Sequence, residues 1–127
     1  MAILGKHADR FYGLMRFVVG FLFACHGAQK LFGAFGGPKM TGNTLLTVAA
    51  LIELVGGGLV ALGLFTTPVA FICSGEMAAA YFLQHAHASF WPIVNKGELA
   101  VVYCFVFLYI AAHGAGGLSL SSPLRRA

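Results

Sequence analysis

The sequence contains few charged residues. Only 9% of its 127 residues are Asp, Glu, Lys or Arg, whereas an ordinary soluble domain has roughly 25%. Hydrophobic residues make up 59% of the chain, and the mean hydropathy is +0.85. A water-soluble domain of this size buries only about two-thirds of its unfolded surface, so it could not shield this much apolar material. The composition therefore excludes an ordinary soluble domain and favours a protein whose outer solvent is lipid.

Three kinds of polar site are also lacking. No basic stripe is interleaved with the aromatic residues, so we do not expect nucleic-acid binding; the net charge of +4 suits lipid headgroups instead. The three cysteines lie in separate apolar stretches and form no C-x-x-C motif. His85 and His87 form an H-x-H pair without the further ligands that zinc requires. We therefore expect no metal site and no dithiol redox centre.

Four apolar stretches span the chain, at residues 13–32, 44–64, 68–83 and 97–112. Each has, or nearly has, the roughly 20 residues that a membrane-spanning helix needs. None alternates apolar and polar residues as the strands of a membrane barrel do. We therefore predict an all-α integral membrane protein, a four-transmembrane-helix bundle that forms one domain over residues 1–127.

The basic residues near the ends of these stretches bear on topology. We expect the first stretch to be retained as a helix rather than cleaved as a signal peptide, because Arg16 interrupts its apolar character. Positive charge is enriched on the cytoplasmic side of membrane proteins. Four basic residues flank the side of the two termini and three flank the other side: Lys6, Arg10, Arg125 and Arg126 against Lys30, Lys39 and Lys96. This favours a multi-pass protein of the cytoplasmic (inner) membrane with both termini in the cytoplasm.

Three of the four acidic residues lie within or beside the apolar stretches: Glu53, Glu76 and Glu98. A charged side chain at the centre of a bilayer costs at least about 2.5 to 3.5 kcal/mol, so such residues face the interior of the bundle, where they pair or take up a proton. We therefore expect these glutamates to belong to a buried polar network.

The first helix offers basic partners. Arg16, His26 and Lys30 fall on one face at 100° per residue. At about 1.5 Å per residue, His26 and Glu53 lie at a similar depth, and Lys30 and Glu98 lie near the same membrane edge. We predict that Glu53 and Glu98 pair with His26 and Lys30, and that Glu76 pairs with Arg16.

Two interpretations of this network remain open. The charges could only hold the four helices in register. Alternatively, they could bind a polar headgroup, such as a quinone ring oxygen, or relay protons, since ionisable groups inside membranes often mark such routes.

The chain also resembles the DoxX family of small bacterial and archaeal membrane proteins. The resemblance covers nearly the whole chain and rests on four stretches: Cys25-His26-Gly27-Ala28-Gln29-Lys30-Leu31-Phe32, Glu53 with Gly56-Gly57 and residues 62–67, Lys96-Gly97-Glu98, and residues 114–120. It implies a four-helix membrane fold that shares His26, Lys30, Glu53 and Glu98. It also implies a link to oxidoreductase systems, including thiosulfate:quinone oxidoreduction and resistance to quinones and oxidative stress.

These observations lead to one expected function and two alternatives. We expect an accessory subunit of a quinone-linked or other oxidoreductase system, which binds a quinone-like or lipidic ligand or docks a redox partner. The chain has no cofactor motif of its own, so we expect no independent catalytic activity. A small-molecule or proton transporter, and a structural assembly subunit of a larger membrane complex, are the alternatives. A homo-oligomer is compatible with each.

Overall fold

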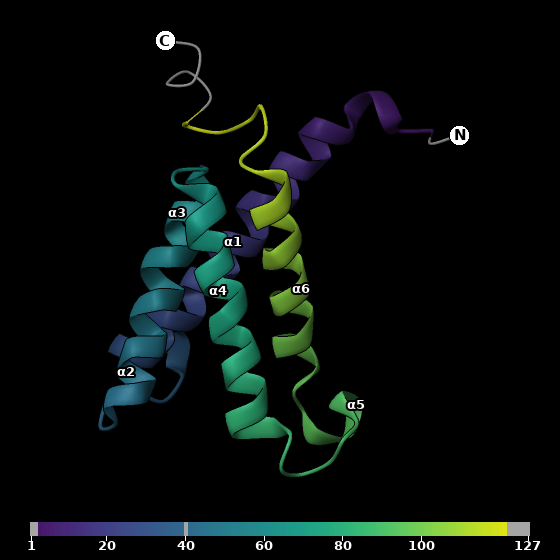
Figure 1. Cartoon of the computed structure of the whole chain (residues 1–127). Helices are drawn as coiled ribbons and strands as arrows, with labels where there is room; N and C mark the ends of the chain where they lie inside the picture. The colour runs from purple at the N-terminus through teal and green to yellow at the C-terminus, as the bar shows by residue number, and fades with distance from the viewer. Residues whose placement is uncertain (1–2, 40, 122–127) are drawn as a thin grey trace.

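Four main helical segments make up the chain in a computed structural model that describes residues 3–39 and 41–121 (Figure 1). The first is α1 (Ala8–Phe32). The second runs without a break through α2 (Thr44–Leu51), the π-turn η3 (Ile52–Gly56) and α3 (Gly57–Leu62). The third joins α4 (Thr66–Ala80) to a second π-turn, η4 (Tyr81–His85). The fourth is α6 (Glu98–His113). Short helices complete the set: η1 (Gly5–His7), η2 (Ala34–Gly36) and α5 (Pro92–Asn95). The predicted all-α class is thus confirmed.

The helix ends follow from local sequence. Gly33 and Gly63 adopt left-handed conformations with φ of 70° and 74° and end α1 and α3, as glycine commonly does at helix C-termini. The side chain of Asn43 caps α2 by accepting a hydrogen bond of 2.8 Å from the Leu45 backbone N–H. α1 begins at Ala8, ahead of the predicted Gly13, because its first turns carry polar residues that the apolar pattern did not include.

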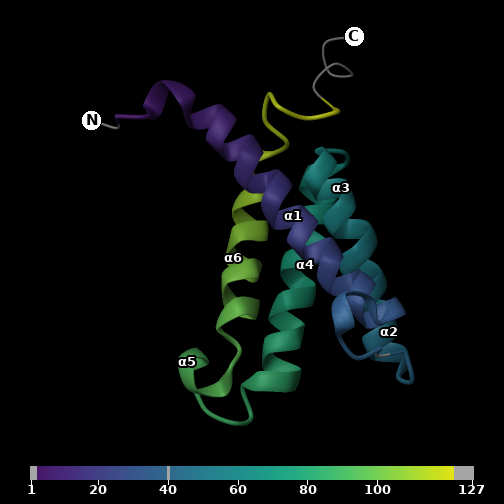
Figure 2. The same ribbon diagram turned by 180° about the vertical axis from the view of Figure 1, so that it is seen from behind.

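Glycines bring α1 against the second segment. A Cβ atom at Gly20 would lie 2.6 Å from the Gly57 carbonyl oxygen, and one at Gly57 would lie 2.6 Å from the Gly20 carbonyl oxygen. A Cβ atom at Gly27 would lie 2.3 Å from the Leu54 backbone nitrogen. Small residues allow two helix backbones to approach this closely. α1 therefore crosses the other helices with its backbone in contact with η3 and α3, as Figure 2 shows from behind.

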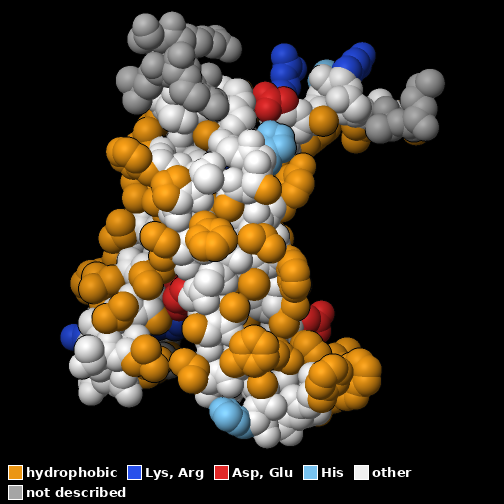
Figure 3. Space-filling model, in the orientation of Figure 1, with side chains coloured by type: hydrophobic (Ala, Val, Ile, Leu, Met, Phe, Trp, Pro, Cys, Tyr) orange, Lys and Arg blue, Asp and Glu red, His pale blue; other side chains and the backbone are white. Residues whose placement is uncertain are grey.

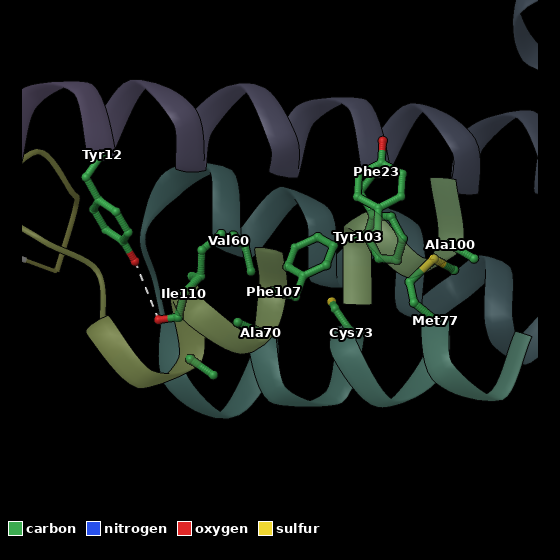
Figure 4. Close-up of a cluster of buried hydrophobic side chains, with 11 residues drawn as sticks. Tyr12, Phe23, Val60, Ala70, Cys73, Met77, Ala100, Tyr103, Phe107 and Ile110 are labelled. Carbon is green, nitrogen blue, oxygen red and sulfur yellow. Dashed lines mark hydrogen bonds between the residues drawn. The ribbon is translucent and has the colours of Figure 1, made fainter. Parts of the chain in front are cut away.

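The core lies where α1, α4 and α6 meet. α4 and α6 run side by side in both views (Figures 1 and 2). Phe23 of α1 packs on Tyr103 and Phe107 of α6 with ring centroids 5.1 and 4.7 Å apart. Cys73 of α4 is fully buried in the same cluster (Figure 4). The cysteine thus fills space in the core, as free cysteines commonly do.

The lateral surface of the molecule is apolar. Large hydrophobic side chains cover the middle of the face in Figure 3, while charged side chains gather toward the two ends. Phe17 and Phe21 of α1, Phe71 of α4 and Phe105 of α6 are each between 47% and 64% exposed. The segments Gly5–Phe32, of 28 residues, and Thr44–Leu62, of 19 residues, are long and apolar enough to cross a membrane. α6 is apolar but shorter, with 16 residues.

The start of α1 and the end of α6 lie at the same end of the bundle (Figure 1). We call this the terminal end, and the opposite end, which carries α5, the distal end. Of the basic residues used for the topology prediction, Arg125 and Arg126 lie outside the described residues.

Candidate functional site

Both π-turns face one region near the distal end. A π-turn adds a residue to a helical turn, and such turns occur frequently at functional sites. η3 carries Glu53, and η4 carries Gln84 and His85. All three side chains line the same cavity. The two departures from regular α-helix therefore converge on one place.

An ion pair forms the centre of this region. Lys30 Nζ donates a hydrogen bond of 2.6 Å to Glu53 Oε2. The Glu53 side chain is only 1% exposed, whereas that of Lys30 is 25% exposed. The close approach at Gly27, one turn before Lys30, places the end of α1 beside η3 and so brings the two charges together. Since a buried carboxylate needs a partner, Lys30 satisfies Glu53 while its ammonium group keeps access to the cavity.

The cavity has a volume of about 190 Å³. Polar side chains from α1, both π-turns and the segment before α6 form one part of its wall: His26, Lys30, Glu53, Gln84, His85 and Lys96. Apolar and aromatic residues form the rest: Phe23, Met77, Ala80, Leu99, Ala100 and Tyr103. Mostly apolar walls with a few convergent polar groups are typical of small-molecule sites. We refer to this space as the polar cavity.

Aromatic rings define one wall of the polar cavity. The His26 ring meets the Tyr103 ring edge to face, with centroids 6.1 Å apart and planes at 86°. Phe23 also packs on Tyr103, as Figure 4 shows. Tyr103 is 7% exposed and Phe23 is 1% exposed. His26 is thus held by packing against α6, at the edge of the core.

The polypeptide between η4 and α6 is tied down by Asn95, which is 5% exposed. Its amide nitrogen donates to Tyr81 Oη at 3.0 Å and to the Ser89 carbonyl at 2.9 Å, and its Oδ1 accepts from the Gly97 N–H at 2.8 Å. The next residue, Lys96, has a φ of 64°. Residues other than glycine rarely adopt this conformation, and such strain is found at functional sites. This network fixes the side of the polar cavity that Lys96 lines.

Glu76 lies behind the ion pair. Its carboxyl group is close enough to the carboxyl group of Glu53 and the ammonium group of Lys30 to interact with both. Among the described residues, its buried Oε2 has no hydrogen-bond partner. The predicted pairing of Glu76 with Arg16 is wrong, because the two residues belong to opposite ends of the bundle.

Arg16 binds backbone carbonyls at the terminal end. Its guanidinium donates to the carbonyl oxygens of Val60 at 2.9 Å, Ala61 at 3.3 Å and Leu118 at 2.6 Å, and to that of Ala115. Carbonyls in the last turn of a helix have no partner within the helix and carry partial negative charge. Arg16, 3% exposed, therefore caps α3 and fastens the chain that follows α6.

The predicted pairing of Glu98 within the buried network is also wrong. Glu98 is exposed at the first residue of α6, and no hydrogen bond or ion pair within residues 3–39 and 41–121 involves its side chain. It does not line the polar cavity. A negative charge in the first turn of a helix is favourable by itself, so Glu98 needs no buried basic partner. Depth along the helices matches His26 with Glu53 and Lys30 with Glu98, but among the described residues Lys30 pairs with Glu53 instead.

Sequence reasoning missed several cavity residues. Gln84, His85, Tyr103 and Lys96 were not proposed as site residues. One signal was present: Lys96, Leu99, Ala100 and Tyr103 follow the spacing of a single helix face. Within the described part of the chain, no group of three His, Cys, Asp or Glu side chains is placed to hold a metal ion.

Comparisons with known proteins agree with the resemblance. A sequence model described as DoxX matches residues 12–86, which include Lys30, Glu53 and both π-turns. Over 126 aligned residues the chain is 42% identical to a protein of Haemophilus influenzae described as uncharacterized, and the alignment covers 94% of each chain. No solved structure matches the chain. The DoxX match covers more than half of the sequence, so this chain belongs to the DoxX family.

Proposed function

We propose that this protein spans the cytoplasmic membrane four times and binds the polar ring of a quinone-like lipid in the polar cavity, as an accessory subunit of an oxidoreductase system. The observation that carries the proposal is the convergence of both π-turns and the Lys30–Glu53 pair on the polar cavity. A structural ion pair alone would not require a cavity beside it.

The apolar lateral surface supports membrane insertion. Two segments are long and apolar enough to cross a bilayer, and the third contains 15 residues in α4 and 5 in η4, close to the roughly 20 that a span needs. The start of α1 and the end of α6 lie at the same end of the bundle (Figure 1), as an even number of membrane crossings requires. The charge of Lys30 is paired inside the bundle, so it counts less when the basic residues on the two sides are compared. With Lys30 discounted, the comparison favours cytoplasmic termini more strongly.

The chemistry of the polar cavity suits an uncharged ring with carbonyl oxygens. An ammonium group has three N–H donors, and among the described residues Lys30 uses one of them, toward Glu53. The remaining donors can reach a ligand oxygen. The Tyr103 and Phe23 rings, whose planes are tilted by 55° to each other, supply an apolar aromatic surface against which a ligand ring can pack. Redox chemistry would take place with a cofactor of the partner enzyme, and this chain would bind and position the lipid.

Equilibrium binding tests the proposal. Purified protein in lipid nanodiscs is titrated calorimetrically with decylubiquinone, alongside the variants Glu53→Gln and Glu98→Gln. We expect Glu53→Gln to raise Kd about tenfold, the effect of losing about 1.4 kcal/mol, because the ammonium group of Lys30 is no longer held in place. Glu98→Gln removes the same charge from an exposed position and should bind like the wild type. An absence of binding by the folded wild-type protein would refute the proposal.

The accessory role has its own test. We expect a membrane-bound oxidoreductase to co-purify with the protein from native membranes in mild detergent, and quinone reduction by that complex to fall when Glu53→Gln replaces the wild type. Purification of the chain alone, with quinone reduction in the membranes unchanged by its removal, would argue against this role.

A further inference from the structure

A second cavity lies on the other side of Lys30, between α2 and the segment of α4 and η4. Its volume is about 250 Å³. Apart from Lys30, Glu76 and Gln84, the residues that line it are apolar, and they include Leu45, Val48, Ile52, Ile72, Ala79 and Leu83. The Oε2 atom of Glu76 is shielded from solvent. We refer to this space as the apolar cavity.

The two cavities adjoin each other. Lys30, Ala80 and Gln84 line both of them. Ala80 is the smallest of these three shared residues. The Lys30 side chain lies between the polar groups of the polar cavity and the aliphatic groups of the apolar cavity. A ligand that contacts Lys30 from the polar cavity is therefore one side chain away from the apolar cavity.

The apolar cavity is open to the side of the bundle. Four of its lining residues are strongly exposed: Leu45 at 60%, Val48 at 47%, Ile72 at 53% and Leu83 at 56%. If the protein spans a membrane, hydrocarbon chains of the bilayer surround this opening. A lipid tail can thus extend from the cavity into the bilayer without crossing a polar region.

We propose that the apolar cavity holds the hydrocarbon tail of the ligand whose ring occupies the polar cavity. This inference rests on the proposed function and specifies its ligand as an amphipathic lipid with one compact polar ring and a long apolar tail. The pairing of a polar space with an adjoining apolar one carries the argument. A small water-soluble ligand would fill the first space and have no use for the second.

Filling the apolar cavity tests this assignment. Ala79 of α4 and Ala49 of α2 line the apolar cavity from opposite sides, and neither lines the polar cavity. Ala79→Phe and Ala49→Phe each place a ring where the tail would lie. Ala112→Phe introduces the same ring at an exposed position of α6 at the terminal end and serves as the matched control. Circular dichroism and size-exclusion chromatography establish that each variant is folded.

Two probes separate the tail from the ring: decylubiquinone, and the same benzoquinone ring without its alkyl tail. We expect Ala79→Phe and Ala49→Phe to raise Kd for decylubiquinone at least about tenfold and to leave Kd for the tail-less ring unchanged. The reason is steric: the introduced ring blocks the path along which the tail of a bound quinone leaves the polar cavity for the bilayer. The tail itself gains little by exchanging bilayer hydrocarbon for an apolar cavity. Ala112→Phe should change neither constant.

The outcomes are distinguishable. If folded Ala79→Phe and Ala49→Phe bind both probes like the wild type, or lose both equally, the tail does not occupy the apolar cavity and the inference is wrong, while the proposed function stands. If the wild type binds neither probe, the proposed function itself fails and the inference falls with it.

Discussion

The pair formed by Lys30 and Glu53 allows a quantitative prediction, because its two members differ in exposure. The Glu53 side chain is 1% exposed and that of Lys30 is 25% exposed, at an Nζ–Oε2 distance of 2.6 Å. Removing one partner of a buried ion pair costs about 3–5 kcal/mol when it leaves the other charge unpaired. We therefore expect Lys30→Met to lower the free energy of unfolding by an amount in this range.

The opposite truncation should cost less. In Glu53→Gln the ammonium group of Lys30 loses its partner but can turn into the polar cavity, which it already lines. We expect a loss of about 1.5–3 kcal/mol, the usual contribution of a hydrogen bond to a charged group. The double variant removes the unpaired buried carboxylate, so it should be more stable than Lys30→Met alone.

Reversible unfolding in mixed micelles, with an increasing fraction of sodium dodecyl sulfate and circular dichroism as the signal, measures all four proteins. The double-mutant cycle then isolates the interaction energy of the pair. Equal losses for the two single variants, or losses that simply add in the double variant, would refute the reasoning from burial.

Three further predictions concern the fold. Arg16→Ala should destabilise the protein by about 3 kcal/mol or more, because bonds from a charged donor contribute about 1.5–3 kcal/mol each; amide hydrogen exchange in residues 114–121 should speed up, and unchanged exchange would contradict the anchoring role. Gly27→Ala should cost about 1–3 kcal/mol by overpacking α1 against Leu54. In contrast, Gly75→Ala, where a Cβ atom would meet nothing within 4 Å, should be neutral or stabilising by up to about 1 kcal/mol; thermal unfolding compares the two. Asn95→Ala should make residues 86–97 more sensitive to limited proteolysis, with no change in cleavage elsewhere.

The helical segments could be predicted from the sequence because their signals are local. Four apolar stretches bounded by Gly and Pro residues determine where helices form and which class of fold results, whatever the packing. The observed segments Thr44–Leu62 and Glu98–His113 begin and end within a few residues of the predicted ranges 44–64 and 97–112.

The composition of the site depended partly on tertiary structure. Depth along the helices indicated that Lys30 and Glu53 belong to one polar network near the distal end, but it matched Glu53 with His26, whereas Glu53 pairs with Lys30. It failed for Glu98, which lies at a similar depth but is exposed. It failed for Arg16 because a guanidinium group can be satisfied by backbone carbonyls, which the sequence of side chains does not reveal.

By itself, therefore, the sequence determined the helices and their apolar surface. It also determined that charged residues had to be accommodated inside the helix bundle. Only the tertiary structure decided which of these charges meet. The rotation of each helix about its axis is set by close contacts such as those of Gly20, Gly27 and Gly57, and by π-turns that shift the faces of two helices. Both depend on atoms far apart in the chain. For this reason the sequence indicated a polar network, and the three-dimensional arrangement placed two adjoining cavities on either side of Lys30.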